Sequence, residues 1–266
     1  MAHVWLAVLL VMGLATGAVF AIDPLLDVQA ALYFRDLSSR LETSGFPSLI
    51  EWFRALGPLV LVAAIAPAVI TLIVKAFLPR RRAPMSSRAA LFLILSLALG
   101  PGLLVNGLLK PYWPRARPYM IVEAPSEYSF TPWWDPRGTC DSNCSFVSGE
   151  VSGAAWLAAP AMLAPLPWRY AALGAVAVYG DAIAFIRLLA GGHFLSDVIF
   201  AAVLTGLVIW ATHGMLFRWP PATRMDNSAL DAALERCGSA MRHLFGLFGA
   251  TARVSRPRPD RPVPPV

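Results

Sequence analysis

Residues 110–118 read Lys-Pro-Tyr-Trp-Pro-Arg-Ala-Arg-Pro, and they place a group of cations where a long apolar run ends and a polar loop begins. Two further polar stretches also lie at the edges of apolar runs. Residues 144–150 read Cys-Ser-Phe-Val-Ser-Gly-Glu, and residues 187–197 contain Arg187, His193 and Asp197. This alternation of apolar and polar stretches predicts that the three polar stretches meet at one face of a membrane.

The apolar runs decide the fold class. Of the 266 residues, 57% are hydrophobic and only 14% are charged, whereas about a quarter of a soluble domain is charged. Backbone polar groups in hydrocarbon must pair within a helix or a closed barrel, and these runs are too long for barrel strands. The sequence therefore predicts an all-α polytopic membrane protein with a six-transmembrane-helix bundle. The six runs approach the ~20 residues that a spanning helix needs and cover 4–22, 56–78, 88–109, 151–165, 169–189 and 194–217.

The distribution of Lys and Arg predicts the orientation of this bundle. One side of the membrane would carry residues 23–55, 110–150 and 187–193, with 8 cations, and the other side would carry 14. Because cytoplasmic loops are enriched in Lys and Arg, the three polar stretches are expected on the outer, periplasmic side. The net charge of +6 is concentrated after residue 217, where it favours contact with anionic lipids over contact with nucleic acid.

The segments outside the core at 56–217 are interpreted one by one. Residues 1–22 form either a retained transmembrane helix or a signal peptide, because the sequence near Ala21 resembles a cleavage site but no Lys or Arg precedes the run. Residues 23–55 alternate apolar patches with charges, as in amphipathic helices in the outer interface or in a packed loop. Residues 218–250 predict a basic amphipathic helix on the cytoplasmic side, and residues 251–266 predict a disordered tail rich in Pro and Arg.

Two cysteines lie four residues apart in the loop at 110–150. If this loop lies outside the cytoplasm, Cys140 and Cys144 would form a disulfide beside Ser148; the alternative is two free thiols. We expect no zinc site, because no further Cys or His lies nearby to complete four ligands.

The stretch at 187–197 carries a candidate nucleophile. His193 and Asp197 are four residues apart, so on a continuous helix they would share a face, and the carboxylate would hold one ring nitrogen. The other nitrogen would then be free to act as a nucleophile or a base. Gly191 and Gly192 interrupt the helical pattern, which would let Arg187 fold back toward His193. The helix N-terminus that follows favours an anion.

The other two stretches add groups that bind an anion. Ser148 and Gly149 come just before an expected helix, so a hydroxyl and free backbone N–H groups would face the same layer. Lys110 and Arg117 supply positive charge, and a guanidinium can grip two phosphate oxygens as a fork. Each of these cations, taken alone, would be interpreted as a side chain that anchors the end of a helix at the membrane interface. The joint arrangement predicts a phosphate site.

These residues resemble the signature of the type 2 phosphatidic acid phosphatase (PAP2) superfamily, which includes bacterial lipid phosphatases such as lipid A phosphatases and undecaprenyl diphosphate phosphatases. The resemblance covers about residues 88–217 and extends to the six-helix plan, which is that of the acid phosphatase–haloperoxidase type. The matching motifs are Lys110-x6-Arg117-Pro118, Ser148-Gly149 and Arg187-x5-His193-x3-Asp197.

The resemblance implies phosphoryl transfer without a metal or another cofactor. It implies that His193 attacks phosphorus to form a phosphohistidine, while Asp197 orients the imidazole. Water would then release the phosphate. The groups implied to hold the phosphate oxygens are Lys110, Arg117, Arg187, Ser148 and the N–H of Gly149.

One position departs from the family pattern. The second motif of the family usually ends in His, which protonates the leaving alcohol, but Glu150 stands in this place here. The other histidines, His3, His213 and His243, are expected on the inner side and cannot replace it. We expect Glu150 to be the general acid. Alternatively, the position is no longer catalytic, which would suit a good leaving group such as a pyrophosphate or an anomeric phosphate.

The motif residues would bind only the phosphate group of the substrate, so they do not identify the lipid that carries it. The leading hypothesis is a lipid phosphatase of the bacterial inner membrane, with its site facing the periplasm and with a phosphorylated lipid and the bilayer as its partners. The cationic, Trp-rich loop at 110–150 slightly favours lipid A over undecaprenyl diphosphate, phosphatidylglycerol phosphate or phosphatidate. A lipid-to-lipid phosphotransferase would use the same residues, and a non-enzymatic lipid-phosphate transporter would line a path with the same cations.

Overall fold

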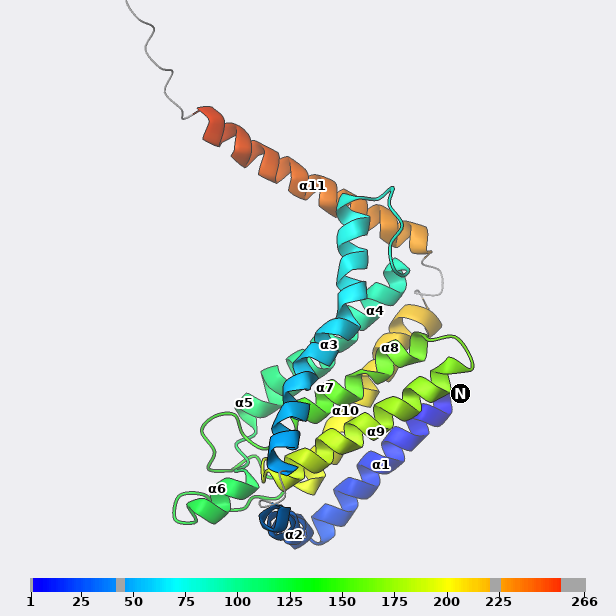
Figure 1. Cartoon of the computed structure of the whole chain (residues 1–266). Helices are drawn as coiled ribbons and strands as arrows, with labels where there is room; N and C mark the ends of the chain where they lie inside the picture. Colours follow the sequence, from blue (N-terminus) through cyan, green and yellow to red (C-terminus); the bar gives the residue numbers. More distant parts are fainter. Residues whose placement is uncertain (1, 42–45, 221–225, 255–266) are drawn as a thin grey trace, which may run out of the picture.

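The protein is a bundle of helices in its computed structural model, which describes residues 2–41, 46–220 and 226–254 (Figure 1). These ranges contain no strand. The helices are α1 (Ala2–Ile22), α2 (Leu25–Leu41), α3 (Phe46–Phe77), α4 (Ser87–Leu97), the π-helix η2 (Ala98–Leu109), α5 (Lys110–Tyr112), α6 (Pro118–Glu123), α7 (Gly149–Trp156), α8 (Ala158–Leu163), α9 (Trp168–Leu189), α10 (Leu195–His213), the π-helix η3 (Gly214–Arg218) and α11 (Asn227–Val254).

Within the described ranges, five helices are long and apolar enough to cross a membrane. The predicted class, a helical polytopic membrane protein, is therefore confirmed. The predicted run at 151–165 forms two short helices in line, α7 and α8, so the count of six spans stays a prediction. The five spans are His3–Ile22, Ile50–Phe77, Ser87–Tyr112, Trp168–Leu189 and Leu195–Arg218.

The break between α7 and α8 has a local cause in Pro160. Proline lacks a backbone N–H, and its ring clashes with the carbonyl four residues earlier, which here belongs to Trp156 at the end of α7. The N–H of Leu157 bonds to the carbonyl of Ala154, only three residues back, and α8 begins at the next residue. The run at 151–165 is therefore interrupted at Leu157 and is not one regular helix.

The span Ser87–Tyr112 is also interrupted by a proline. It begins as α4, widens into the π-helix η2 around Pro101, and ends in the short helix α5. A wider turn is one way to accommodate a residue that cannot donate to the regular ladder. The side-chain amide of Asn106 donates to the carbonyl of Pro101 at 2.6 Å. This span places Lys110 at the end of the bundle where α5 and α6 lie.

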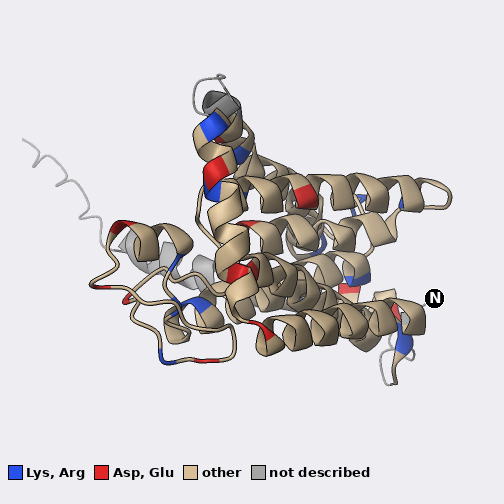
Figure 2. Cartoon of the chain, turned by 90° about the horizontal axis from the view of Figure 1, so that it is seen from below, with Lys and Arg blue, Asp and Glu red and all other residues tan. Residues whose placement is uncertain are grey.

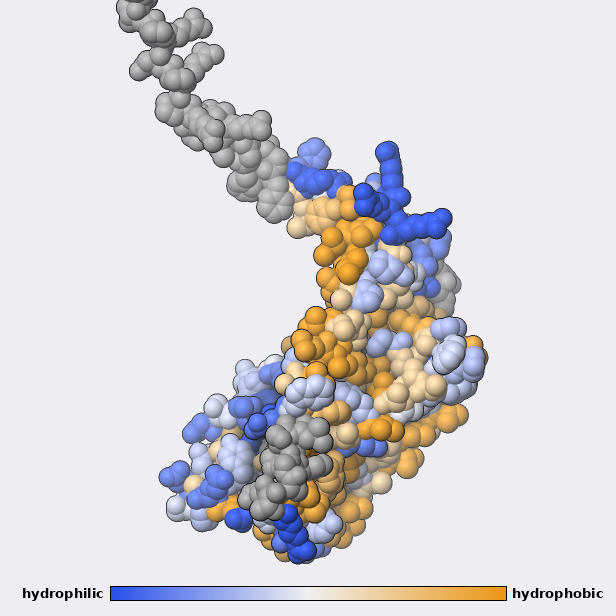
Figure 3. Space-filling model, viewed as in Figure 1, coloured by the Kyte–Doolittle hydropathy of each residue, from blue (hydrophilic) through white to orange (hydrophobic). Residues whose placement is uncertain are grey.

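The two ends of the bundle carry different elements. Helices α2, α5 and α6 lie at one end, and α11 lies at the other, where it packs against α3 and α4 (Figure 1). Hydrophobic side chains cover the helical shafts and hydrophilic ones gather at both ends (Figure 3). Seen from below, most of the helix surface carries no charge (Figure 2). Of the segment at 23–55, α2 is a separate helix, whereas residues 46–55 are the first turns of α3.

Helix α1 packs along α10. A Cβ added at Gly206 would lie 2.7 Å from Cδ2 of Leu9, so the helices approach closely at this point. This packing joins the N-terminal run to the helix that follows His193.

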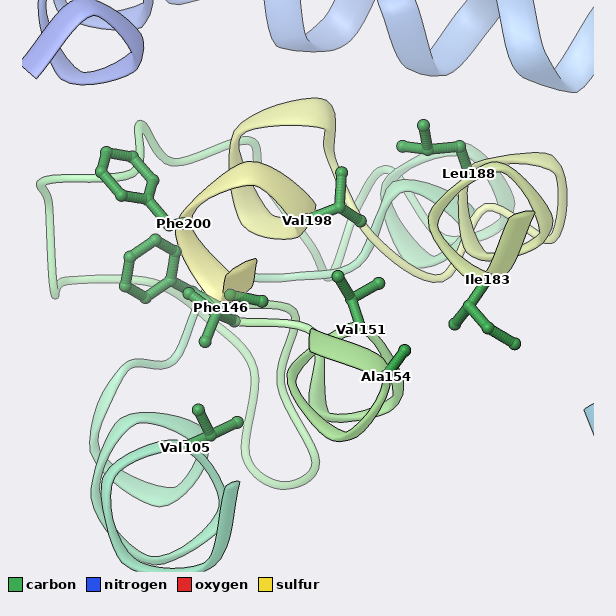
Figure 4. Close-up of a cluster of buried hydrophobic side chains, with 10 residues drawn as sticks. Val105, Phe146, Val151, Ala154, Ile183, Leu188, Val198 and Phe200 are labelled. Atoms are coloured by element: carbon green, nitrogen blue, oxygen red, sulfur yellow. The ribbon is translucent and has the colours of Figure 1, made fainter. Parts of the chain in front are cut away.

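A buried apolar cluster lies between η2, α7, α9 and α10 (Figure 4). Its members neighbour the polar stretches in sequence: Val147 precedes Ser148, and Val198 follows Asp197. Packing of this cluster therefore fixes the helix ends that carry the polar residues. The buried members are Val105, Phe146, Val147, Val151, Ala154, Ile183, Leu188, Val198, Phe200 and Ala201.

Candidate active site

Backbone hydrogen bonds tie the three polar stretches together. The N–H of Tyr119, one residue past the first stretch, donates to the carbonyl of Gly191 at 3.1 Å. The N–H of Ser148 donates to the carbonyl of Asp197 at 3.5 Å. The structure thus brings the stretches at 110–118, 144–150 and 187–197 to the same end of the bundle.

The turn between α9 and α10 carries His193. Helix α9 ends at Leu189 and α10 begins at Leu195. Gly191 has φ of +60°, a left-handed conformation that glycine adopts without the steric cost of a side chain. The chain can therefore reverse here, and His193, which is only 2% exposed, lies ahead of α10.

The imidazole of His193 has one engaged and one free nitrogen. Its Nδ1 lies 2.7 Å from the carbonyl oxygen of Ser145, and a carbonyl can only accept, so Nδ1 carries the proton and Nε2 is the basic nitrogen. Burial lowers the pKa of His193 well below its usual value, and the positive charges of Arg187, Arg117 and Lys110 lower this pKa further. The ring is therefore neutral at pH 7, as a nucleophile must be.

Asp197 does not hold His193 directly. Its Oδ2 is 4.0 Å from Nδ1 of His193, and it accepts instead from the hydroxyl of Ser145 and, at 2.9 Å, from the N–H of Phe194. The direct contact expected from the four-residue spacing fails because that spacing applies within a helix, and α10 begins only at Leu195. Ser145 joins the two residues: its hydroxyl contacts Asp197 and its carbonyl contacts His193.

Arg187 reaches the site from the last turn of α9. The side chain is 8% exposed, and Nη1 lies 3.4 Å from Oε1 of Glu150. Within the described part of the chain, its Nε is buried and has no hydrogen-bond partner. A buried guanidinium donor of this kind is costly unless it meets an acceptor, and a phosphate oxygen would be a suitable one.

Lys110 and Arg117 share one acceptor, Asn143. Arg117 donates through Nε to the carbonyl and through Nη2 to Oδ1 of Asn143, both at 2.8 Å. Lys110 Nζ lies 3.4 Å from the same Oδ1. Asn143 has φ of 50°, a left-handed conformation that asparagine tolerates better than most residues. Its main chain and side chain together fix the spacing of the two cations.

The loop that holds Asn143 is closed by a disulfide between Cys140 and Cys144, with Cα atoms 5.8 Å apart. The loop is also anchored to the first polar stretch, since the N–H of Cys140 donates to the carbonyl of Pro114 and that of Ser145 donates to the carbonyl of Arg115. The pairing considered from the sequence is therefore present, and it steadies the acceptor of Arg117.

Ser148 and Gly149 form the N-terminus of α7. Ser148 is the N-cap residue, and its hydroxyl accepts from the N–H of Val151 at 3.4 Å. A Cβ added at Gly149 would lie 3.3 Å from Lys110 Nζ and 3.0 Å from Oδ1 of Asn106. Glycine therefore lets the lysine approach the helix N-terminus, whose N–H groups and dipole favour an anion.

Glu150 lies on the exposed side of the site. Its carboxylate accepts from Arg54 of α3, through Nη2 at 3.1 Å and Nε at 3.4 Å, and also lies near Arg187. The side chain is 42% exposed. The two guanidinium groups hold the carboxylate at the mouth of the site, and its exposure leaves it in contact with water.

A cavity of about 610 Å³ opens beside these residues, between α3, η2, α7 and α9. Lys110, Gly149 and Glu150 line its polar part, and Leu61 and Leu157 line its apolar part. A larger apolar cavity of about 910 Å³ lies between α1, α9 and α10, but no residue of the predicted site lines it. Of these two cavities, the smaller one is thus lined by residues of the predicted site, although His193, Arg117 and Arg187 are not among its lining residues.

Several contacts of the site were not predicted from the sequence. Arg115 lies in the first polar stretch, but no motif assigns it a role, and Asp27 lies in the segment at 23–55. No feature of a single sequence pairs positions so far apart. The residues missed are Asp27, Arg54, Arg115, Asn143, Ser145 and Ser196.

Comparison with known proteins identifies the family. The family model for the PAP2 superfamily matches residues 89–221. A lipid A 4'-phosphatase of Francisella tularensis subsp. novicida (strain U112) is 30% identical over 203 residues, which cover 75% of this chain and 90% of that protein. No solved structure matches the chain significantly.

Two relatives from Rhizobium are matched over a shorter region. The lipid A 4'-phosphatases of Rhizobium leguminosarum and Rhizobium etli are 39% and 40% identical over 116 residues, or 44% of this chain. The alignments span 49% and 45% of those proteins, about half of their length. The chain belongs to the PAP2 superfamily, and it is a phosphatase of membrane lipids.

Proposed function

We propose that this phosphatase removes a phosphate group from a lipid at the periplasmic face of the bacterial inner membrane, through a phosphohistidine on His193. The observation that carries the proposal is the state of that imidazole. It is buried, its Nδ1 is engaged by Ser145, and three cations near it keep the ring neutral. This leaves Nε2 as the nucleophile beside a group of residues suited to a phosphate.

The reaction would proceed in two steps. In the first, Nε2 of His193 forms a bond to phosphorus, and the bond between phosphorus and the lipid oxygen breaks. The leaving oxygen takes a proton from Glu150. In the second, water attacks the phosphohistidine, gives a proton to the carboxylate of Glu150, and releases inorganic phosphate with His193 restored. Neither step calls for a metal or another cofactor.

The cations would stabilise the charge that develops on the phosphoryl oxygens. Arg187 offers a buried Nε that has no hydrogen-bond partner among the described residues, and Asn143 holds Lys110 and Arg117 at a fixed spacing. Positioned donors of this kind supply most of the catalysis in phosphoryl transfer. Ser148 and the N–H of Gly149 add donors at the N-terminus of α7.

Glu150 is the proposed general acid in place of the usual His. Its carboxylate lies between Arg54 and Arg187. A bound phosphate dianion would compete for the same guanidinium groups and would free the carboxyl group to meet the leaving oxygen. Substrate binding would thus place the acid that the reaction needs.

The substrate proposed is a lipid A phosphate. The relatives matched here carry the name lipid A 4'-phosphatase, and one of them is matched over 90% of its length. The cavity of about 610 Å³ joins the cations to apolar walls, as a phosphate on an acylated lipid requires. Undecaprenyl diphosphate and phosphatidylglycerol phosphate are the alternatives that the assay must separate.

The orientation proposed follows from charge. The end of the bundle with α2, α5 and α6 belongs to the side with fewer Lys and Arg residues, and α11 belongs to the side with more. The active site would therefore face the periplasm, where a disulfide is also favoured.

Phosphate release from a panel of lipid phosphates, with His193→Ala protein as the blank, tests the proposal. We expect lipid A phosphate to be hydrolysed and the blank to be inactive. If an added acceptor lipid becomes phosphorylated and less inorganic phosphate is released, the protein is a phosphotransferase. Movement of a lipid phosphate across vesicles that survives His193→Ala, with no phosphate released by either protein, would overturn the proposal in favour of a transporter.

A further inference from the structure

A group of buried charges surrounds Asp197, next to His193. Arg115 has an exposed fraction of 0%, and the carboxylates of Asp27 and Asp197 are 1% and 0% exposed. None of these three residues lines the cavity of about 610 Å³. We infer that Asp27 of α2 and Arg115 are positioning residues for Asp197, and through it for His193. This inference rests on the proposed function, in which His193 is the nucleophile.

Arg115 is the centre of the group. Its Nη1 donates to Oδ1 of Asp197 and, at 2.9 Å, to the hydroxyl of Ser196, and its Nη2 donates to Oδ2 of Asp27 at 2.8 Å. Its Nε donates to the carbonyl of Thr131 at 2.9 Å, and its guanidinium lies 4.2 Å from the ring centroid of Phe194. The guanidinium therefore has a single orientation, set from all sides by partners that are themselves buried.

Asp27 completes the group from a distant part of the chain. Its Oδ1 accepts from the N–H of Ser196 at 2.9 Å, and its Oδ2 accepts from the hydroxyl of Ser196. Ser196 lies in the first turn of α10, so Asp27 both caps this helix and pairs with Arg115. The first turn of α2 is thereby fixed to the first turn of α10, beside Asp197.

The effect reaches His193 through Ser145. The hydroxyl of Ser145 donates to Oδ2 of Asp197, and its carbonyl accepts from Nδ1 of His193 at 2.7 Å. If Asp197 shifts, Ser145 loses its hydroxyl partner, and its carbonyl is then free to move from Nδ1. Arg115 contacts Asp197 through Nη1. Asp27 and Ser196 bind the same guanidinium group, and so fix the angle at which it meets Asp197.

Asp27 lies outside the part of the chain that carries the family signature. The family model matches residues 89–221, and Asp27 lies outside that range. One of the two carboxylates that pair with Arg115 is thus supplied by the N-terminal part of the chain. Helix α2 would therefore take part in the reaction, although it contributes no group to the cavity.

A double-mutant cycle tests the inference. We expect Asp27→Asn to lower kcat by about 10- to 100-fold, the usual cost of losing a supporting contact, with KM nearly unchanged because no phosphate contact is lost. In the Asp197→Asn background, the same change should lower kcat by less than about threefold, since residues that act as a unit are not additive. If Asp197→Asn is as inactive as the His193→Ala blank, Ser145→Ala serves as the background.

Two matched variants keep the test decisive. Asp36→Asn removes a carboxylate from an exposed ion pair on the same helix and should leave kcat unchanged. Ser196→Ala removes only a neutral hydroxyl from the group, so it tests the same contacts if Asp27→Asn does not fold. It should lower kcat less than Asp27→Asn, and should again have no effect in the Asp197→Asn background.

The outcomes separate the two proposals. Equal losses of kcat in both backgrounds, matched by a loss of folded protein in thermal unfolding, would mean a structural role and would overturn the inference. Unchanged kcat in Asp27→Asn and Ser196→Ala would overturn it as well. Neither result contradicts the proposed function, which fails if His193→Ala retains phosphatase activity or if neither protein releases phosphate.

Discussion

Two carboxylates flank His193, and they are held in opposite ways. Asp197 has no exposed surface, and its oxygens are occupied by Arg115, Ser145 and the N–H of Phe194. Glu150 is 42% exposed, and its partners Arg54 and Arg187 contact it at 3.1 Å or more.

This difference separates the roles that the two carboxylates can fill. A carboxylate that is fully enclosed and whose two oxygens are both engaged keeps its place through the reaction, as is needed to orient an imidazole. A carboxylate at the edge of a cavity can exchange a proton with water and can lose its partners to a phosphate. The buried side of the site thus suits positioning, and the open side suits proton transfer.

Removing the buried charge should have the largest effect. Asp197→Asn keeps the shape but loses an acceptor of Arg115 and Ser145, so we expect kcat to fall by roughly 10⁴-fold, of the order seen when a His loses its orienting carboxylate. The fall should be similar for alkyl and aryl phosphates, because orientation of the nucleophile precedes loss of any leaving group. Initial rates with both substrates measure it, and a loss confined to alkyl phosphates would reverse the roles given to the two carboxylates.

Removing the exposed charge should have an effect that depends on the leaving group. Glu150→Gln cannot donate a proton to an alkoxide, so kcat for an alkyl monophosphate should fall by about 10²-fold or more. An aryl phosphate, whose leaving group needs little protonation, should be hydrolysed nearly as fast as by the unaltered protein. Unchanged turnover of the alkyl substrate would mean that Glu150 is not the acid.

The pH profile is the control for this prediction. The pKa of His193 is lowered, so its neutral form persists as the pH falls through about 6.5, the usual pKa of a histidine. A general acid, by contrast, donates only from its protonated form, and that form becomes scarcer as the pH rises. Activity on alkyl phosphates should therefore peak below neutral pH and decline on the alkaline side, and this decline should be absent in Glu150→Gln. A flat profile up to pH 8 would contradict a carboxyl acid.

The open side of the site was the easier one to predict from the sequence. Lys110, Arg117 and Arg187 stand where apolar runs end, so hydropathy alone brings them to one face, and the family motifs then assign them to a phosphate. Glu150 was recognised because it replaces an expected His. What the sequence did not indicate is Arg54, because α3 extends outward past the predicted span and carries it over the site.

The contacts on the buried side could not be predicted from the sequence, and the reason is physical. Asp27 and Ser196 are 169 residues apart, and their contact depends on how α2 folds back against α10. The four-residue spacing of His193 and Asp197 suggested a direct bond, but the helix begins after His193. Periodicity predicts which residues share a face only where a helix exists, so a contact across a turn requires the structure.

Filling the cavity on the open side of the site should have the smallest effect on activity, and this effect should depend most on the substrate. Gly153 of α7 lines the cavity of about 610 Å³, and no atom lies within 4 Å of a Cβ added there. Gly153→Leu should raise KM for a long-chain lipid phosphate by about tenfold and should leave a short-chain phosphate ester unaffected, because the phosphate contacts are intact. Gly174→Leu is the matched control, since Gly174 also has open space around it but does not line this cavity. Equal changes in KM for both substrates, or the same change in Gly174→Leu, would show that the acyl chains lie elsewhere and that the exposure of Glu150 has no connection with the path of the lipid.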